Sequence, residues 1–210
     1  MFKRRREIWK TLNIEITLNN HNYKVPKGQI VTLKVPNGKS VIIKQLFMEA
    51  YPTNLIKISI NRKPISNYTL NELKKLIVYL SKETGIFHGT IMENIKNGRV
   101  NVSEREIVSA SRAANALKFI LDLPRGYNTI IGEGDAILSA GQRQRIAIVR
   151  AILAKEPILI LDNATSAVDI ESEKLVQQGL KALVKDKFII VVDSSIDSPD
   201  ICEIRSNKCV

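Results

Sequence analysis

Three consecutive residues, Gly38-Lys39-Ser40, have the side chains of a phosphate-binding loop, and they follow a β-branched run that ends near Val35. In such a loop glycine lets successive backbone N–H groups curl around a phosphate, lysine reaches its oxygens, and serine ligates Mg²⁺. A complete loop has the pattern G-x-x-x-x-G-K-[ST], but Leu33 stands at the first glycine position. The triplet is common, so alone it does not distinguish a phosphate loop from chance.

A carboxylate follows an apolar run in "PILILDNATSAVD" (157–169), where Asp162 comes directly after a predicted buried strand. Doubly wound parallel sheets place ligand-facing groups at the carboxyl ends of their strands. An aspartate at such a position can hold Mg²⁺ through water in a phosphoryl-transfer site. A helix N-cap or a turn aspartate is the other interpretation of the same pattern.

A third candidate is the turn Ser139-Ala140-Gly141, which opens a strongly helical segment, "LSAGQRQRIAIVRAILAK" (138–155). The free backbone N–H groups and the dipole at a helix start favour a phosphate there. The apolar residues farther along recur at helical spacing, so we expect most of this helix to be core and only its first turn to be functional.

The elements around these candidates alternate between strand and helix, which predicts an α/β protein with a mostly parallel sheet. Ser103 and Glu106 form the pattern of a helix capping box. A helix start is also predicted at Asn71, after Leu70. We expect strands over 29–35, 54–60, 157–161, 188–192 and one ending near Ser81, and helices over 40–50, 103–123, 138–155 and 170–184.

Composition narrows the function classes. The chain has 210 residues, enough for one sizeable domain, and a net charge of +11. Its 32 Lys and Arg are scattered apart from the Lys3–Arg6 cluster, and only 5% of residues are aromatic, which does not favour nucleic-acid binding. Contact of that cluster with a membrane surface or a partner stays open. Every apolar run is far shorter than the roughly 20 residues of a membrane helix.

The motifs in order resemble the nucleotide-binding domain of ATP-binding cassette (ABC) transporters, of the exporter type found in multidrug and type I secretion systems. "LSAGQ" and "LDNATSAVD" match the family's "LSGGQ" and "DEATSALD", and "GIFHGTIMENI" (85–95) and "LPRGYNTIIGEGDAIL" (123–138) resemble exporter segments. The resemblance implies a P-loop NTPase (RecA-like) core, an N-terminal β subdomain and an inserted α-helical subdomain. Over 1–210 it places the core at about 1–82 and 150–210, and the helical subdomain at about 83–149.

The resemblance also implies a composite site, in which one subunit supplies the phosphate loop and the other covers the phosphate with its signature helix. We call the part with the phosphate loop the receiving half and the part with the signature helix the giving half. The residues of the receiving half depart from those of the family. Its loop is about two residues short, Lys82 replaces the glutamine of the Q-loop, Asn163 replaces the general-base glutamate, and Ser194 replaces the switch histidine. An amide is not a base, and a hydroxyl cannot supply imidazole chemistry. Trp9 is the main candidate for the aromatic that stacks on adenine, with Tyr23 as the other.

The giving half keeps the family's residues more fully, with Ala140 in place of one glycine. The resemblance thus implies that this chain binds ATP and Mg²⁺ weakly. The residues it implies for the nucleotide are Asn37, Gly38, Lys39, Ser40, Val41, Lys82, Ser139, Ala140, Gly141, Gln142 and Asp162, with Ser40 and Asp162 for the metal.

A homodimer would break both composite sites, so we expect a heteromeric second nucleotide-binding domain. We also expect a transmembrane domain on a separate chain or on a lost N-terminal portion, and a place on the cytoplasmic face of the membrane. The expected function is that of the ATP-binding subunit of an exporter that hydrolyses ATP weakly or not at all. Two alternatives are an active ABC ATPase despite the substitutions, and a non-ATPase structural or interaction module.

Overall fold

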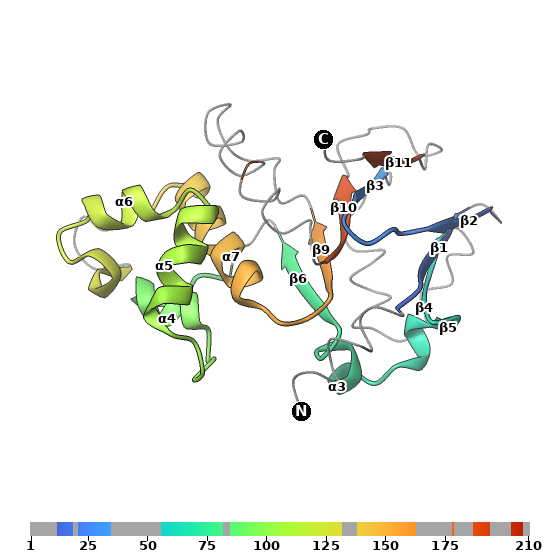
Figure 1. Ribbon diagram of the computed structural model, residues 1–210, viewed down its shortest axis with the longest axis horizontal. Helices are drawn as coiled ribbons and strands as arrows, with labels where there is room; N and C mark the ends of the chain where they lie inside the picture. The colour runs from blue at the N-terminus through green and yellow to red at the C-terminus, as the bar shows by residue number, and fades with distance from the viewer. Residues whose placement is uncertain are drawn as a thin grey trace. The chain divides into compact units, whose positions relative to one another are not determined.

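The computed structural model describes residues 12–18, 21–34, 56–81, 85–131, 138–162, 178, 187–193 and 203–207. Its elements divide into two compact units, 1–79 with 156–161 and 186–210, and 80–155 with 162–185. The first unit is built on strands and the second on helices (Figure 1).

The first unit contains a four-stranded sheet in the order β2-β1-β4-β5. The pairs of β1 with β2 and with β4 are antiparallel, and Ile16 lies opposite Tyr23 on one side and Ile58 on the other. Alternate residues of β1 are buried, as expected for a strand with one face on a core. The strands are β1 (Ile14–Leu18), β2 (His21–Lys24), β4 (Ile56–Ile60) and β5 (Lys63–Pro64).

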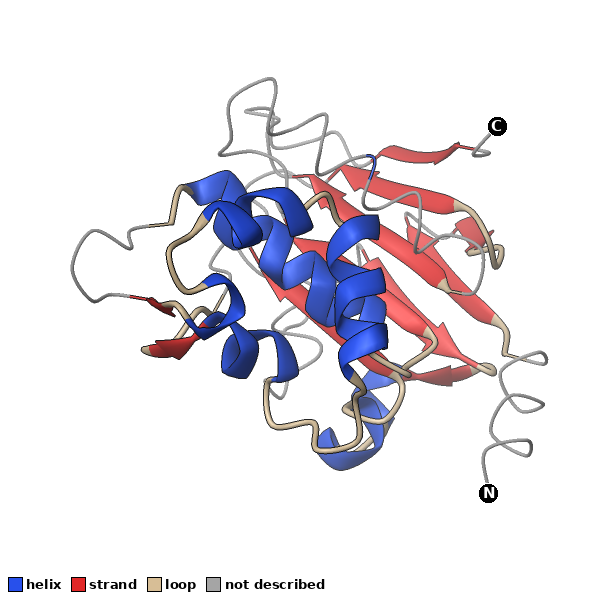
Figure 2. Ribbon diagram, turned by 60° about the vertical axis from the view of Figure 1, so that its left-hand side comes forward, coloured by secondary structure: helices blue, strands red, loops and turns tan. Residues whose placement is uncertain are grey.

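A five-stranded sheet follows, in the order β11-β3-β10-β9-β6, and its strands run side by side in Figure 2. The pair β10–β3 is parallel, with Val191 opposite Thr32, whereas β11 joins β3 antiparallel. The arrows of β6, β9 and β10 point the same way in Figure 1. These strands are β3 (Ile30–Lys34), β6 (Ile77–Ser81), β9 (Ile158–Asp162), β10 (Phe188–Asp193) and β11 (Glu203–Asn207).

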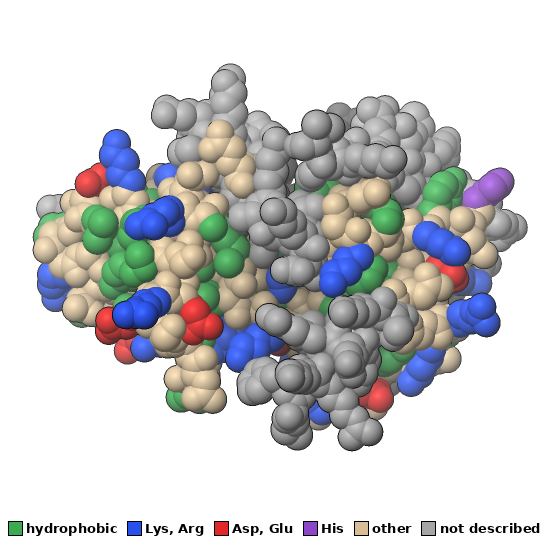
Figure 3. Space-filling view, in the orientation of Figure 1, with side chains coloured by type: hydrophobic (Ala, Val, Ile, Leu, Met, Phe, Trp, Pro, Cys, Tyr) green, Lys and Arg blue, Asp and Glu red, His purple; other side chains and the backbone are tan. Residues whose placement is uncertain are grey.

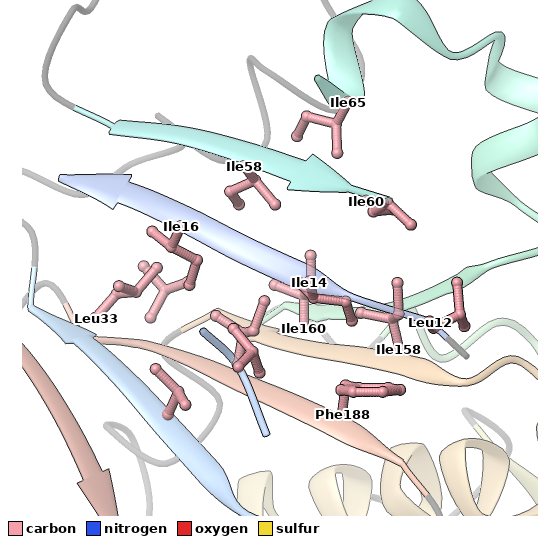
Figure 4. Packing of buried hydrophobic residues seen from close by; sticks show 14 of the residues in the cluster. Leu12, Ile14, Ile16, Leu33, Ile58, Ile60, Ile65, Ile158, Ile160 and Phe188 are labelled. Carbon is pink, nitrogen blue, oxygen red and sulfur yellow. The ribbon is translucent and has the colours of Figure 1, made fainter. Parts of the chain in front are cut away.

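The apolar faces of the two sheets share one core (Figure 4). Ile14 and Ile16 of β1 contribute from one sheet, and Leu33, Ile160 and Phe188 from the other. Burial of branched aliphatic side chains from both layers stabilises the pairing of the sheets. Between β5 and β6 the chain forms a turn of 3₁₀ helix, η1 (Ile65–Asn67), and the short helix α3 (Leu70–Leu73).

The described residues of the second unit form helices α4, α5, α6 and α7 and a small two-stranded ladder of β7 with β8. Helix α5 packs against both α6 and α7, and α4 also contacts α7. The elements are β7 (Gly89–Thr90), α4 (Ile91–Lys96), α5 (Glu104–Ala113), α6 (Leu117–Asp122), the 3₁₀ helix η2 (Gly126–Asn128), β8 (Ile130–Ile131) and α7 (Ala140–Leu153).

The predicted α/β class and the parallel strands are confirmed, and β3, β4, β6, β9 and β10 coincide with the predicted strands. The predicted helix over 103–123 is two helices, because Asn115 takes a left-handed conformation with φ of 54° between them. The helix predicted from Asn71 begins at Leu70, since Thr69 and Glu72 form its capping box. The predicted helices over 40–50 and, apart from Gln178, over 170–184 lie outside the described residues.

Lys and Arg side chains of the described residues stand apart from one another on the face in Figure 3. None of the helices within the described ranges is both long and apolar enough to cross a membrane.

Candidate functional site

The start of α7 carries the predicted phosphate-facing turn. Ser139 is the N-cap, with extended backbone angles, and its Oγ accepts a 3.2 Å hydrogen bond from the Gln142 N–H. The Gln142 Oε1 in turn accepts a 2.9 Å bond from the Ser139 N–H. This reciprocal pair is a capping box, which satisfies two backbone donors that the helix cannot satisfy itself. The structure thus brings the predicted residues Ser139 to Gln142 together in one turn.

The charge at this helix start differs from that of the other capped helices. Glu72, Glu93 and Glu106 occupy the third position of the boxes at α3, α4 and α5, whereas α7 has the neutral Gln142 and no acidic residue in its first turn. Hydrogen bonds from the N-cap backbone, and then from its side chain, hold the pKa of each of the three glutamates below its usual value. Those three helix starts therefore carry a carboxylate, while the positive end of the α7 dipole is left without one.

The exposure of the residues to solvent changes along this turn. Ser139 is exposed, Ala140 and Gln142 are partly buried, and Gly141 is buried, so the cap lies at the surface and the helix behind it enters the core. The Arg143 guanidinium donates to the Leu138 carbonyl just before the cap. Arg143 thus places a positive charge near the first turn of α7, and the helix start still has no carboxylate.

A second arginine fixes the same helix against its neighbours. Arg145 Nη1 donates a 3.0 Å bond to the Asn115 carbonyl, and its guanidinium lies 4.9 Å from the centre of the Phe119 ring. Its Nε also reaches the Gly141 carbonyl at 3.3 Å. Arg145 therefore ties the first turns of α7 to the corner between α5 and α6.

Asp162 is the last residue of β9, whose five residues are all buried. Its side chain is only 8% exposed, and its Oδ1 is buried with no hydrogen bond from the described residues, although Asp162 also takes part in other interactions. Mg²⁺ prefers carboxylate oxygens, and a strand end of a parallel sheet is where such a ligand faces a nucleotide. The donor type and the position of Asp162 fit the predicted metal role.

Tyr23, the second candidate for the aromatic that stacks on adenine, lies in β2 and is 38% exposed. The other predicted site residues lie outside the described residues. Three of them follow described strand ends in the sequence, because Lys82 comes after β6, Asn163 after β9, and Ser194 after β10. Their roles stay predictions. The remaining residues of this group are Trp9, Asn37, Gly38, Lys39, Ser40 and Val41.

One group of polar residues near α7 was not predicted. Asn94 of α4 and Arg150 of α7 are buried and hydrogen-bond to each other, with 2.9 Å between Arg150 Nη2 and Asn94 Oδ1. The spacing of residues along α7 could have indicated the buried arginine of this pair. Arg150 follows Ile146 by four residues, which puts a cation on the apolar face of the helix.

Comparison with known proteins identifies a family model and relatives that match most of this chain. The family model described as "ABC transporter" matches residues 18–166. An "ATP-dependent lipid A-core flippase" of Haemophilus influenzae (strain 86-028NP) is 41% identical over 192 residues, which are 89% of this chain and 32% of the relative. The "Multidrug resistance protein pgp-1" of Caenorhabditis elegans is 42% identical over 177 residues, 83% of this chain and 13% of that protein.

A solved structure agrees with these matches. A bacterial Atm1-family ABC exporter with ATP bound superposes with a TM-score of 0.71 at 28% identity, over 87% of this chain and 34% of the exporter chain. The chain thus spans about a third of the length of the flippase and exporter chains it matches.

Proposed function

We propose a function for this chain from one premise, which is that it belongs to the ABC transporter family. In this proposal the chain is the ATP-binding part of an exporter. It lends the start of α7 to ATP bound by a second, different nucleotide-binding domain. Its own phosphate loop holds ATP and Mg²⁺ weakly and hydrolyses ATP slowly or not at all.

The capping box of α7 is the observation that supports the proposal most directly. Ser139 is exposed at a helix start that carries no carboxylate, whereas α3, α4 and α5 each carry one. A triphosphate is anionic, so it is favoured at such a neutral helix start and repelled by a capping glutamate. The arrangement suits donation to a partner's phosphate.

The residue types of the receiving half support weak hydrolysis. Asn163 stands where the family has its general base, and loss of a general base typically costs about 10²- to 10⁴-fold in rate. Ser194 cannot replace an imidazole, and Lys82 adds a cation where the family has a neutral amide. The loop that follows β3 is about two residues shorter than the family's and has no glycine at its head, where the backbone needs one for curling around the phosphates.

The metal would be held by Asp162, together with Ser40 of the phosphate loop. Mg²⁺, when bound, neutralises charge on the phosphate oxygens. The contribution of the chain is a carboxylate fixed at a buried strand end, where it loses little conformational freedom on binding.

We further propose that the core at about 1–82 and 150–210 and the helical subdomain at about 83–149 act as one nucleotide-binding domain. The transmembrane domain of the exporter would place it at the cytoplasmic face of the membrane. The flippase, the multidrug resistance protein and the ATP-bound exporter among its relatives support export as the process that it serves.

A complementation assay tests the proposal. The partner is an ABC nucleotide-binding domain with an intact phosphate loop, glutamate and histidine, in which arginine replaces its own signature serine. We expect such a partner to hydrolyse ATP slowly alone and at least about tenfold faster with this chain, equivalent to about 1.4 kcal/mol of barrier. Ser139→Arg in this chain should abolish the stimulation.

Two controls separate the alternatives. Lys39→Ala in this chain should leave the stimulation unchanged, because the lysine belongs to the receiving half. ATP turnover by the chain alone, lost on Lys39→Ala, would instead establish an active ABC ATPase. Binding of a fluorescent ATP analogue tighter than about 100 µM, or about 5.5 kcal/mol, would contradict weak binding by the phosphate loop.

A further inference from the structure

Asn115 closes the end of α5 in a left-handed conformation, with φ of 54°. Its N–H donates a 3.1 Å bond to the Arg112 carbonyl, and the Ala116 N–H donates a 2.8 Å bond to the Ser111 carbonyl. These two bonds form a Schellman motif, which satisfies carbonyls that the end of a helix leaves free. The Asn115 carbonyl belongs to the same planar peptide group as the Ala116 N–H, so it points away from the end of α5 in a fixed direction.

Arg145 of α7 binds this carbonyl. Its Nη1 donates a 3.0 Å bond to the Asn115 oxygen, and its Nε donates a 3.3 Å bond to the Gly141 carbonyl, one turn earlier in its own helix. The guanidinium also lies 4.9 Å from the centre of the Phe119 ring in α6, which is within the range of a cation–π interaction. One planar group thus joins the first turn of α7 to α6 and to the end of α5, and a lysine ammonium lacks the fork that this geometry needs.

The carbonyl that Arg145 binds in α7 lies in the turn of the capping box. Gly141 is buried between Ser139 and Gln142, whose side chains bond each other's backbone. The Nε bond holds the Arg145 side chain against this turn, and the Nη1 bond holds the turn against the Asn115 corner. A displacement of Gly141 therefore moves the exposed Ser139 as well.

The other end of α7 has an anchor of its own. Arg150 Nη2 donates a 2.9 Å bond to Asn94 Oδ1, which also accepts a 3.0 Å bond from the Phe87 N–H. Ser139 lies eleven residues before Arg150, which is about 16 Å of α-helix at 1.5 Å per residue. A helix fixed only at its last turn pivots there, and its first turn is displaced most. Arg145 opposes such a pivot from the first half of the helix.

We propose that Arg145 is a positioning residue for the start of α7. By joining Gly141 to the carbonyl of Asn115, it sets the direction in which Ser139 faces the phosphate of the partner domain. The role rests on the proposed function, in which that phosphate belongs to ATP bound by a second nucleotide-binding domain. Positioning is important in such a site, because a misplacement of about 1 Å can cost about 100-fold in rate.

The complementation assay, analysed for two constants, tests this role. Arg145→Lys keeps the charge and loses the fork, so we expect the maximal turnover of the partner to fall at least about tenfold. The concentration of this chain that gives half-maximal stimulation should change by less than about twofold. Arg105→Gln, at an exposed position of α5, is the control and should leave both constants unchanged.

The two constants separate positioning from stability and from charge. A variant that only folds less completely needs more chain to saturate the partner and then reaches the same maximal turnover, so this result would overturn the role. Full maximal turnover with Arg145→Lys, together with a loss in Arg145→Gln, would show that charge alone matters and would overturn it too.

The acceptor is tested by two substitutions of Asn115 that both remove its 3.3 Å side-chain bond to Gln178. Asn115→Gly permits the left-handed backbone and should keep the maximal turnover, whereas Asn115→Ala strains it and should lower the turnover at least about threefold. With Arg145→Gln already present, Asn115→Ala should cause no further loss, because the carbonyl then has no donor. Losses that multiply would overturn the pairing of the two residues.

Hydrogen exchange of the chain alone separates a failure of this inference from a failure of the proposed function. In Arg145→Lys the amides of residues 142–144 should exchange at least about threefold faster, while those of β1 and β4 keep their rates. Unchanged exchange at 142–144, or a uniform rise over both units, would overturn the positioning role. A local rise, combined with no stimulation of the partner by the unmodified chain, would instead reject the proposed function. Asn115→Ala tests the same contact from the other side if the Arg145 variants do not fold.

Discussion

Ser139 and Gln142 bond each other's backbone at the start of α7, with the Ser139 N–H 2.9 Å from Gln142 Oε1 and the Gln142 N–H 3.2 Å from Ser139 Oγ. The residues expected to face a phosphate are therefore also the residues that cap the helix. A substitution in this turn can therefore change the stability of α7, the charge that its start presents to a ligand, or both.

Gln142→Glu separates the two effects. Glutamate is a good third residue of a capping box, so the free energy of unfolding should change by less than about 0.5 kcal/mol. The new carboxylate should lower stimulation of the partner's ATP turnover at least about tenfold, because it repels the phosphate.

Urea unfolding and the complementation assay measure these two effects. Gln142→Ala is the control, since it breaks the box without adding charge and should cost about 1 kcal/mol of stability. Stimulation by Gln142→Glu at the level of the unmodified chain would contradict the role of the neutral helix start.

Asp162→Asn should remove the Mg²⁺ dependence of nucleotide binding. Asparagine keeps the shape of the side chain but not the charge that attracts the metal. We expect Mg²⁺ to improve binding of a fluorescent ATP analogue about tenfold in the unmodified chain and hardly at all in the variant, a difference of about 1.4 kcal/mol. Titrations with Mg²⁺ and with EDTA measure it, and an unaltered ratio in Asp162→Asn would exclude this carboxylate as a ligand.

Acid should weaken the cap of α5. The Ser103 backbone N–H donates a 2.8 Å bond to Glu106 Oε2, and this bond, followed by that of the Ser103 hydroxyl, lowers the pKa of Glu106 from its usual 4.5. A carboxyl with a lowered folded pKa binds fewer protons in the folded than in the unfolded chain. Its stabilisation is present above pH 4.5 and is lost as the pH falls through the folded value.

Urea midpoints at pH 6, 4.5 and 3.5 test this dependence. Glu106→Gln should lose less stability between pH 6 and 3.5 than the unmodified chain, because its amide accepts the same bonds without titrating. Glu104→Gln, in the same helix turn but outside the box, is the control. Identical pH profiles for Glu106→Gln and the unmodified chain would reject the explanation.

Gly89→Ala should destabilise the start of α4. Gly89 has φ of 152°, and a Cβ there would lie 2.9 Å from Glu93 Oε2, the atom that accepts from the Thr90 N–H at 2.7 Å. Backbone strain and displacement of this capping carboxylate together should cost about 1–3 kcal/mol. The free energy of unfolding in urea measures the cost.

Gly98→Ala is the matched control, because its φ is 78° but its Cβ would meet nothing within 4 Å. It reports the conformational cost alone, about 1–2 kcal/mol. In a Glu93→Ala background the penalty of Gly89→Ala should fall, since the atom it displaces is gone. An unchanged penalty there would show that the carboxylate plays no part.

Local patterns were sufficient to predict much of this protein. The capping box at Ser103 and the strands around Leu33, Ile160 and Ile190 follow from residue types at short spacing, because caps and buried strands depend on near neighbours. The break at Asn115 was not predicted, since the surrounding apolar periodicity continues through it. Ordered motifs likewise indicated the family, which the matched model confirms.

What the sequence alone determined is which helix start carries Ser139 and Gln142 and which strand ends in Asp162. Only the tertiary structure decided that Asn94, Phe87 and Arg150 form one group. Arg150 lies 56 residues after Asn94 and 65 after Gly85, and no local pattern specifies a partner at such a separation. Burial brings these residues together, because a guanidinium and an amide taken out of water need hydrogen-bond partners wherever the chain folds to supply them.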